Sequence, residues 1–407
     1  MRRKDYAAHK QRAAARSRES ALIGRDIGLL PPVADPARRR AAAASFRLFC
    51  ETYFPEVFAL PWSSDHLKVI EKIETAVRKG GLFAVAMPRG SGKTSLCKAA
   101  CLWAALYGYR DFVALIGSSE THAQGLLHDL KIQLETNELL AADFPEVCFP
   151  IRALEGIANR CKGQLYQGQR TYIEWTADRI VLPTIPGSSA SGVVMTVAGI
   201  TGQIRGMSYQ RPDGRIARPS LVVIDDPQTD ESARSPSQCA AREAILAGAI
   251  LGLAGPGEKI SGIMPCTVIR PGDMADRILD RNLHPEWNGE RTKMVYQWPK
   301  NEELWKRYAE LRAESFRRGG SGKDATEFYR KNREAMDEGA VVAWPERYNH
   351  DELSAVQHAM NLKLQDERAF WAEYQNEPLP ETSAKEEDLS ADAVAAKLNR
   401  LRRGEVP

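Results

Sequence analysis

The chain has 407 residues, 43% of them apolar and 27% charged, and a formal net charge of only +3. This composition excludes a wholly disordered chain and a fibrous repeat, while the length allows two or three domains. The sequence has no run of about 20 apolar residues and no signal-peptide core behind its N-terminus, so we expect a cytoplasmic protein with no membrane contact. Seven cysteines without a Cys-x-x-Cys pair favour reduced thiols over disulfides or a zinc site.

Residues 1–45 form a basic segment, with 11 Lys and Arg against 4 Asp and Glu. This segment could be a solvated arm or a short amphipathic helix, and we favour the arm. From Phe46 onward, apolar and aromatic residues become frequent. We therefore expect the folded domain to begin at about residue 46.

Four short apolar runs are typical of strands that are buried on both faces of a parallel sheet. They cover residues 82–87, 112–117, 220–225 and 259–264. Helical patterns separate several of these runs, over residues 94–107, 121–134 and 235–253. This alternation predicts an α/β fold in which helices flank a mostly parallel sheet. A less regular insertion should contain a hairpin over 171–182 and a further strand over 193–198.

Beyond Trp298 the sequence becomes helical and charged. Helices are expected over residues 302–316, 325–336 and 352–374. From Asn376 the composition suits an exposed linker. The expected organisation is a basic arm over 1–45, a sheet domain over 46–300, a helical subdomain packed on it over 301–377, and a linker over 378–407.

The most informative motif is the segment Pro88-Arg-Gly-Ser-Gly-Lys-Thr94, which lies between an expected strand and an expected helix. Glycines permit a tight turn there, so backbone N–H groups and the helix N-terminus can face phosphate oxygens. We expect Lys93 to reach the β- and γ-phosphates of a nucleotide and Thr94 to hold Mg²⁺. Met87 replaces the first glycine of the usual G-x-x-x-x-G-K-S/T pattern, and a glycine-rich turn with a surface lysine is the alternative. The expected nucleotide-binding residues are Pro88, Arg89, Gly90, Ser91, Gly92, Lys93, Thr94 and Ser95.

A second motif is the apolar strand that ends in Asp225-Asp226. A nucleotide loop needs a carboxylate to complete the Mg²⁺ shell, and Asp225 would supply it, directly or through water. Asp226 would orient or deprotonate the attacking water. The alternative is a strand capped by the turn Asp-Asp-Pro-Gln, which carries no chemistry.

Two arginines could offset negative charge on a transferred phosphoryl group. Arg89 lies inside the loop, and Arg205 lies in the segment Gly202-Gln-Ile-Arg-Gly206. Either side chain could instead make a structural ion pair. The place of Arg89 in the loop favours function, whereas the two interpretations of Arg205 are balanced.

Three motifs together resemble the large terminase subunit of tailed bacteriophages, with a likeness that runs from about Phe46 to Pro378. They are Pro88–Thr94, Ile204-Arg-Gly206 ahead of Val222-Val-Ile-Asp-Asp-Pro227, and Phe370-Trp-Ala-Glu-Tyr-Gln-Asn-Glu-Pro378. That family is the ATP-driven motor that packages double-stranded viral DNA into a procapsid, and its loop commonly carries an arginine at the position of Arg89 and lacks the first glycine.

The resemblance implies a P-loop NTPase of the RecA/ASCE-like class that uses ATP and Mg²⁺. It also implies a homo-oligomeric ring, double-stranded DNA, a portal protein and a small terminase subunit as partners. The location implied is the cytoplasm of an infected bacterial host, docked on the procapsid during packaging. The basic arm could bind DNA, contact the small subunit or be merely solvated.

Individual residues carry over from the family by position. Asp226 stands where the family commonly has Glu, so the base role is implied less directly. The coupling motif falls at Ile263-Met-Pro-Cys-Thr267, with Thr267 as its polar residue, although a turn hydroxyl is the alternative. On the adenine side, His66 and nearby Trp62 are weak candidates, and a helix-start residue is the alternative for His66. Arg205 could act in trans, as an arginine finger on a neighbour's nucleotide.

Large terminase subunits normally continue into an RNase H-like nuclease with an acidic cluster that binds two metals. Residues 377–407 are too few for such a domain. We expect either a fragment or a nuclease on a separate polypeptide. Two other functions stay open: a helicase-like, nucleic-acid-dependent ATPase, and a nucleotide-binding assembly scaffold that hydrolyses nothing.

Overall fold

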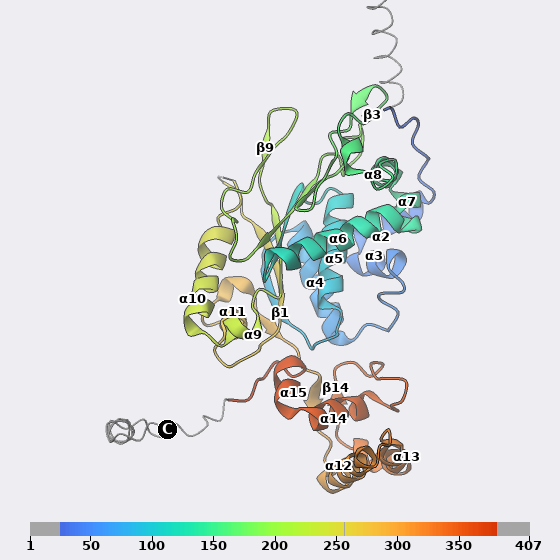
Figure 1. The fold of residues 1–407 in the computed structure, drawn as a ribbon, viewed down its shortest axis with the longest axis vertical. Helices are drawn as coiled ribbons and strands as arrows, with labels where there is room; N and C mark the ends of the chain where they lie inside the picture. The colour runs from blue at the N-terminus through green and yellow to red at the C-terminus, as the bar shows by residue number, and fades with distance from the viewer. Residues whose placement is uncertain (1–24, 256, 381–407) are drawn as a thin grey trace, which may run out of the picture.

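A central eight-stranded sheet organises the protein, with helices on both of its faces and a smaller helical region beside one end (Figure 1). This computed structural model describes residues 25–255 and 257–380. Most of the expected arm and most of the expected linker therefore lie outside the described residues. Within those two ranges, no helix is long and apolar enough to cross a membrane.

The first six strands of the sheet run parallel, and the last two form an antiparallel edge. In spatial order they are β12 (Glu290–Arg291), β1 (Leu82–Ala86), β11 (Ser261–Cys266), β10 (Leu221–Asp225), β2 (Phe112–Gly117), β7 (Val194–Gly199), β6 (Arg179–Val181) and β5 (Glu174–Trp175). The four expected strands and the strand after the insertion are confirmed, with ends that differ by two residues or fewer. The expected hairpin is also confirmed, and it extends the main sheet.

Burial on both faces explains why the central strands are continuous apolar runs. Every residue of β2, β10 and β11 is buried. Alternate residues point to opposite faces, so Val223 joins one core cluster and Ile224 the other. Gly262 on β11 leaves room for its neighbours, because an added Cβ would lie 2.9 Å from the Leu82 side chain.

Helices α4, α5 and α6 cover one face of the sheet, and α10 and α11 cover the other (Figure 1). The helices expected over residues 94–107 and 121–134 are confirmed as α5 and α6. The third expected helix, 235–253, is α10 followed by a π-helical turn over Leu246–Ile250. The helices of this domain are α2 (Pro36–Ala44), α3 (Phe46–Tyr53), α4 (Ser64–Arg78), α5 (Lys93–Leu106), α6 (Glu120–Thr136), α7 (Glu138–Asp143), α8 (Pro145–Arg152), α9 (Asp230–Ala233), α10 (Pro236–Ile245) and α11 (Met274–Leu279).

Short elements complete the sheet domain. Two small hairpins project from it, and two 3₁₀ turns join longer segments. They are β3 (Leu165–Tyr166) with β4 (Gln169–Arg170), β8 (Tyr209–Gln210) with β9 (Ile216–Ala217), and the turns Ala158–Cys161 and Pro285–Trp287.

The expected arm is too long at its C-terminal end, because helix α2 belongs to the folded domain. Asp35 caps this helix, and Ala42 is fully buried. Arg38 donates two hydrogen bonds of 2.7 Å to the buried carboxylate of Asp143, and Arg39 pairs with Glu146. These basic residues are therefore neutralised by acids on α7 and α8, and the domain begins before residue 46.

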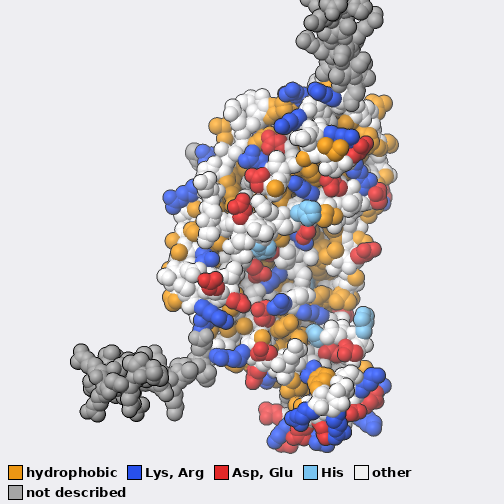
Figure 2. Space-filling view, viewed as in Figure 1, with side chains coloured by type: hydrophobic (Ala, Val, Ile, Leu, Met, Phe, Trp, Pro, Cys, Tyr) orange, Lys and Arg blue, Asp and Glu red, His pale blue; other side chains and the backbone are white. Residues whose placement is uncertain are grey.

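The C-terminal region is a helical subdomain that returns to the sheet domain at its end. Its elements are β13 (Val295–Gln297), α12 (Glu302–Arg317), α13 (Lys323–Asp337), β14 (Val341–Val342), α14 (Ala355–Gln365) and α15 (Glu367–Glu373). Because β13 pairs with β14, the subdomain begins near residue 295, before the expected boundary at 301. Acidic and basic side chains alternate over its lower surface (Figure 2).

The single helix expected over 352–374 is wrong. The chain breaks at Asp366, which is extended and whose side chain accepts a hydrogen bond from the Ala369 N–H. An aspartate is a strong N-cap because its carboxylate satisfies a free N–H of the first turn. Asp366 therefore ends α14 and begins α15, and this turn lets α15 approach the loop after β1.

Candidate functional site

The loop between β1 and α5 has the backbone of an anion cradle. Gly90 and Gly92 have φ values of 73° and 80°, which glycine adopts without strain. Gly92 is the N-cap of α5 and provides no side-chain cap, so the first N–H groups of α5 keep their capacity to bind an anion. A Cβ on Gly92 would meet nothing within 4 Å, so open space lies above the cradle.

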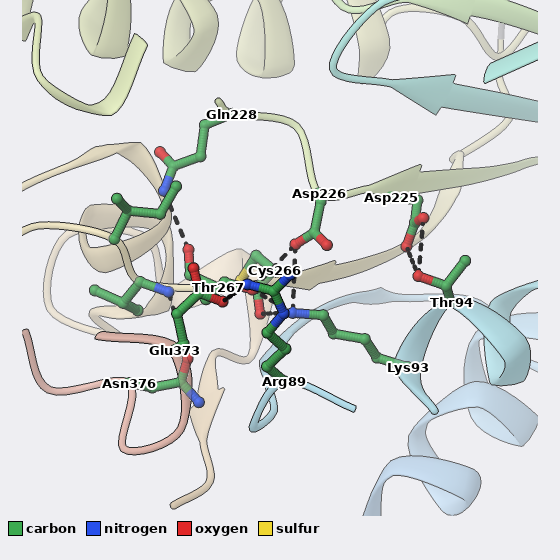
Figure 3. Close-up of polar contacts among 12 residues, drawn as sticks. Arg89, Lys93, Thr94, Asp225, Asp226, Gln228, Cys266, Thr267, Glu373 and Asn376 are labelled. Atoms are coloured by element: carbon green, nitrogen blue, oxygen red, sulfur yellow. Dashed lines mark hydrogen bonds and ion pairs between the residues drawn. The ribbon is translucent and has the colours of Figure 1, made fainter. Parts of the chain in front are cut away.

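The C-terminal ends of the parallel strands β1, β10 and β11 bring polar residues together beside this loop (Figure 3). Thr94, which follows β1, places its hydroxyl 3.1 Å from both carboxylate oxygens of Asp225 at the end of β10. The Nζ of Lys93 lies 3.5 Å from Oδ1 of Asp226, and it also contacts the hydroxyl of Thr267, which follows β11. Residues from three distant parts of the sequence therefore form one cluster.

Asp226 has an unusual backbone conformation and a carboxyl group with a shifted pKa. Its φ of 39° lies in the left-handed region, which is uncommon for a residue with a side chain. Burial raises the pKa of its carboxyl, while Lys93 and Thr267 act in the opposite direction. A raised carboxyl pKa brings the group closer to the range that suits a general base near neutral pH.

In comparisons with known proteins, no family model matches this chain and no curated protein matches it. The chemistry of the donors therefore carries the interpretation of the cluster. A hydroxyl and a carboxylate in contact, Thr94 and Asp225, are hard oxygen ligands of the kind that Mg²⁺ takes alongside substrate phosphates. The described residues contain no group of three or more His, Cys, Asp and Glu side chains that could hold a metal by themselves. The set fits a magnesium ion that phosphate oxygens help to bind.

His66, in the first turn of α4, contacts the backbone of the loop. Its Nε2 lies 2.9 Å from the Ser91 carbonyl, and its Nδ1 lies 2.7 Å from the Ser63 hydroxyl, so both ring nitrogens have partners. Burial lowers the pKa of His66, which favours the neutral ring that donates to Ser91. The adjoining cavity, of about 20 Å³, has room for a water molecule but not for a base. The structure therefore gives His66 a supporting contact, and nothing in this geometry places it against adenine.

The other expected site residues lie around the cluster. Ser95 faces away from it, into a cavity of about 280 Å³ that Phe54 and Phe58 also line. The side chain of Arg89 is 68% exposed and lies 3.5 Å from the Glu373 carboxylate. Arg205 lies on the exposed loop after β7, and within the described part of the chain it has neither a hydrogen bond nor an ion pair. The remaining residue, Pro88, begins the loop and accepts the Ser91 N–H.

One residue that the sequence analysis missed is His122. It lies near the end of β2, the strand next to β10, and its Nε2 is 3.5 Å from Asp225. The hydrogen bond to Asp225 raises the pKa of His122. Its position in the sequence could have indicated this, because His122 closely follows an expected strand that ends at the same edge of the sheet as the strand before Asp225.

The end of the helical subdomain also reaches the site. The backbone carbonyl of Glu373 accepts the Arg89 N–H at 2.7 Å. The buried Asn376 side chain accepts from the Val268 N–H, directly after Thr267, and donates to the Thr292 carbonyl. Both residues lie in the segment Phe370–Pro378, which carried the family resemblance without being assigned a role.

Proposed function

We propose that the protein is a Mg²⁺-dependent ATPase with a RecA/ASCE-like P-loop fold. One observation carries this proposal: the Thr94 hydroxyl lies 3.1 Å from both oxygens of Asp225 although 131 positions separate the two residues. A lysine and a second carboxylate, Lys93 and Asp226, flank that pair. This combination beside a glycine cradle is what phosphoryl transfer requires, since its catalysis is mostly positioning and charge stabilisation.

Each residue then has a defined task. Thr94 and Asp225 would hold Mg²⁺, which neutralises charge on the phosphoryl oxygens. Lys93 leaves Asp226 and Thr267 to bind phosphate, because a lysine is a mobile point charge on a flexible stem. Asp226, once released from Lys93, accepts a proton from the attacking water, and Thr267 orients its carboxylate through a contact of 3.3 Å. Arg89, on the rim of the loop, adds positive charge.

We further propose that the ATPase is the motor of a phage terminase large subunit that moves double-stranded DNA into a procapsid. The support is that all three resemblance motifs lie at or near one edge of the sheet. Glu373 contacts the loop, and Asn376 contacts Val268, the residue directly after Thr267. A homo-oligomeric ring, portal protein and small terminase subunit are the partners that this proposal includes. Exposed Arg205 is proposed to act on the nucleotide of a neighbouring copy.

The decisive experiment measures ATP hydrolysis with and without double-stranded DNA. Lys93→Ala and Asp226→Asn should each reduce the rate at least about 100-fold, because both remove transition-state interactions. Lys306→Ala, an exposed lysine on α12, is the matched control and should keep full activity. Equal activity in Lys93→Ala and the control would contradict the proposal.

The same assay separates the alternatives. ATP binding without turnover would favour the assembly scaffold, and melting of a DNA duplex would favour a helicase-like enzyme. If Arg205 acts in trans, then Arg205→Ala loses hydrolysis in the assembled ring, and mixing it with Lys93→Ala restores part of the activity. Unchanged hydrolysis by the Arg205→Ala ring would remove that role.

A further inference from the structure

The guanidinium of Arg347 lies directly on the phosphate-binding loop. Arg347 belongs to the C-terminal subdomain, between β14 and α14. Its Nη2 donates a hydrogen bond of 2.6 Å to the carbonyl of Arg89. A Cβ added to Gly90 would lie 2.6 Å from the same nitrogen, so the guanidinium is packed against the glycine backbone. A residue that is 258 positions away in the sequence thus covers the tip of the loop.

The charge of Arg347 has no carboxylate partner in the part of the chain that the structure describes. In residues 25–255 and 257–380, no carboxylate forms an ion pair with it, and its one hydrogen bond uses one of five N–H donors. Its other neighbour is the ring of Tyr374, whose centroid is 6.0 Å from Cζ. Arg347 is partly buried, and this burial lowers its pKa. The two cations of the loop itself do have carboxylate partners: Lys93 is paired with Asp226, and Arg89 is paired with Glu373.

A second polar group on the loop also lacks a partner within the described residues. The hydroxyl of Ser91 is buried and has no hydrogen-bond partner among the described residues. Ser91 and Arg347 line the same small cavity. This cavity, of about 20 Å³, has room for a water molecule that would satisfy Ser91, whereas the Arg347 cation calls for a negatively charged partner. Because the Arg347 guanidinium lies on Gly90 of the anion cradle, the partner that its charge calls for is an anion bound at the loop.

We propose that Arg347 is a nucleotide-binding residue that contacts the polyphosphate of the substrate from the C-terminal subdomain. This inference rests on the proposed nucleotide binding and assigns it a further residue. An arginine is suited to the task because its planar fork of donors matches phosphate oxygens, with several bonds to one group. The bond to the Arg89 carbonyl would hold the guanidinium in place, ready for the ligand.

The test compares binding of ATP, ADP and AMP, each with Mg²⁺, by calorimetry. Arg347→Gln should weaken ATP binding at least about tenfold, ADP binding less, and AMP binding least, because the lost charge acts on the β- and γ-phosphates. Arg347→Lys should recover part of the loss for ATP. Arg330→Gln, which removes an exposed arginine of α13 in the same subdomain, should bind all three nucleotides as the unmodified protein does.

A purely structural role would give a different result. If Arg347 only supports the fold, Arg347→Gln lowers the melting temperature without nucleotide and weakens all three nucleotides equally, and this outcome would overturn the proposal. Unchanged ATP binding would overturn it as well. If the unmodified protein binds none of the three nucleotides, the proposed function itself fails. Normal binding by the unmodified protein together with no selective loss in Arg347→Gln refutes the role of Arg347 alone.

Discussion

Two clusters of charged residues in this protein look alike in composition but differ in how completely they are paired. The N-terminal ion-pair cluster joins α2 to α7 and α8 through Arg38, Arg39, Asp143 and Glu146. There the buried Asp143 carboxylate accepts from Arg38, from the Tyr53 hydroxyl and from the Asp35 N–H. The cluster is complete without any ligand, and it docks one helix on another.

The loop site is the opposite case. Lys93 is shared among Asp226, Thr267 and the Cys266 carbonyl, at distances that include two long contacts of 3.4 and 3.5 Å. Among the described residues, the Ser91 hydroxyl has no hydrogen-bond partner and the Arg347 charge has no carboxylate partner. Folding alone satisfies the first cluster, whereas folding leaves polar groups of the second without partners among the described residues. Incomplete pairing is thus a better guide to a ligand site than charge density.

The largest expected effect that tests this comparison is on stability. Asp143→Ala should destabilise the protein by about 2 kcal/mol, because it leaves Arg38 and the Tyr53 hydroxyl without their acceptor. Arg38 is partly exposed, so the loss should be smaller than for a fully buried ion pair. ATP hydrolysis per folded molecule should not change. Urea unfolding measures the first quantity. Asp213→Ala, which breaks an exposed pair with Arg215, is the matched control and should unfold at nearly the same urea concentration as the unmodified protein.

If fully folded Asp143→Ala lost ATP hydrolysis, the contrast between the two clusters would be wrong, because the N-terminal cluster would then be part of the ATPase site. Full stability would show that the pairing of Asp143 is dispensable.

The fold could largely be read from the sequence because its main signals are local. Apolar runs marked the strands, and the loop after β1 was recognised from its glycines. For residues 1–45 a short helix was left open but a solvated arm was favoured, because the acidic partners of Arg38 and Arg39 lie 105 and 107 positions away. The break at Asp366 was missed because helical periodicity continues on both sides of it.

Prediction of the site had the same limit. The requirement of a nucleotide loop for a carboxylate that completes the Mg²⁺ shell linked Lys93 and Thr94 to Asp225 and Asp226, and the family resemblance added Thr267. No such rule could place Arg347 or His66, because their contacts depend on how separate elements pack. Arg347 is one of many arginines in the sequence, and only the fold reveals that it faces the loop.

The second test concerns the loop site and should leave stability unchanged. Thr267→Val keeps the shape of the side chain but removes the hydroxyl that joins Lys93 to Asp226. A hydrogen bond of this kind contributes about 1.4 kcal/mol, so hydrolysis should slow about tenfold. Thr267→Ser keeps the hydroxyl and should hydrolyse ATP at close to the normal rate. An equal loss in both variants would show that the methyl group matters more than the hydroxyl and would contradict the role given to Thr267.

The smallest expected effect is the pH dependence of the N-terminal ion-pair cluster. Burial opposes ionisation of Asp143, but hydrogen bonds from Arg38 and Tyr53 prevail and lower its pKa below the ordinary value. A carboxyl whose pKa is lower in the folded state stabilises the protein above its unfolded pKa of about 4, and this contribution is lost as the pH falls through the folded pKa. Asp143→Asn has no titratable group at this position, so it lacks this pH-dependent contribution to stability.

The free energy of unfolding should therefore differ most between the unmodified protein and Asp143→Asn near neutral pH, and the difference should shrink as the pH is lowered below about 4. Urea unfolding of both proteins across this range measures it. Asp213→Asn is again the control, since its carboxylate is exposed and should contribute little to folding at any pH. A difference that stays constant with pH would mean that Asp143 acts through its shape and its neutral hydrogen bonds, and the N-terminal cluster would then no longer be an example of complete charge pairing.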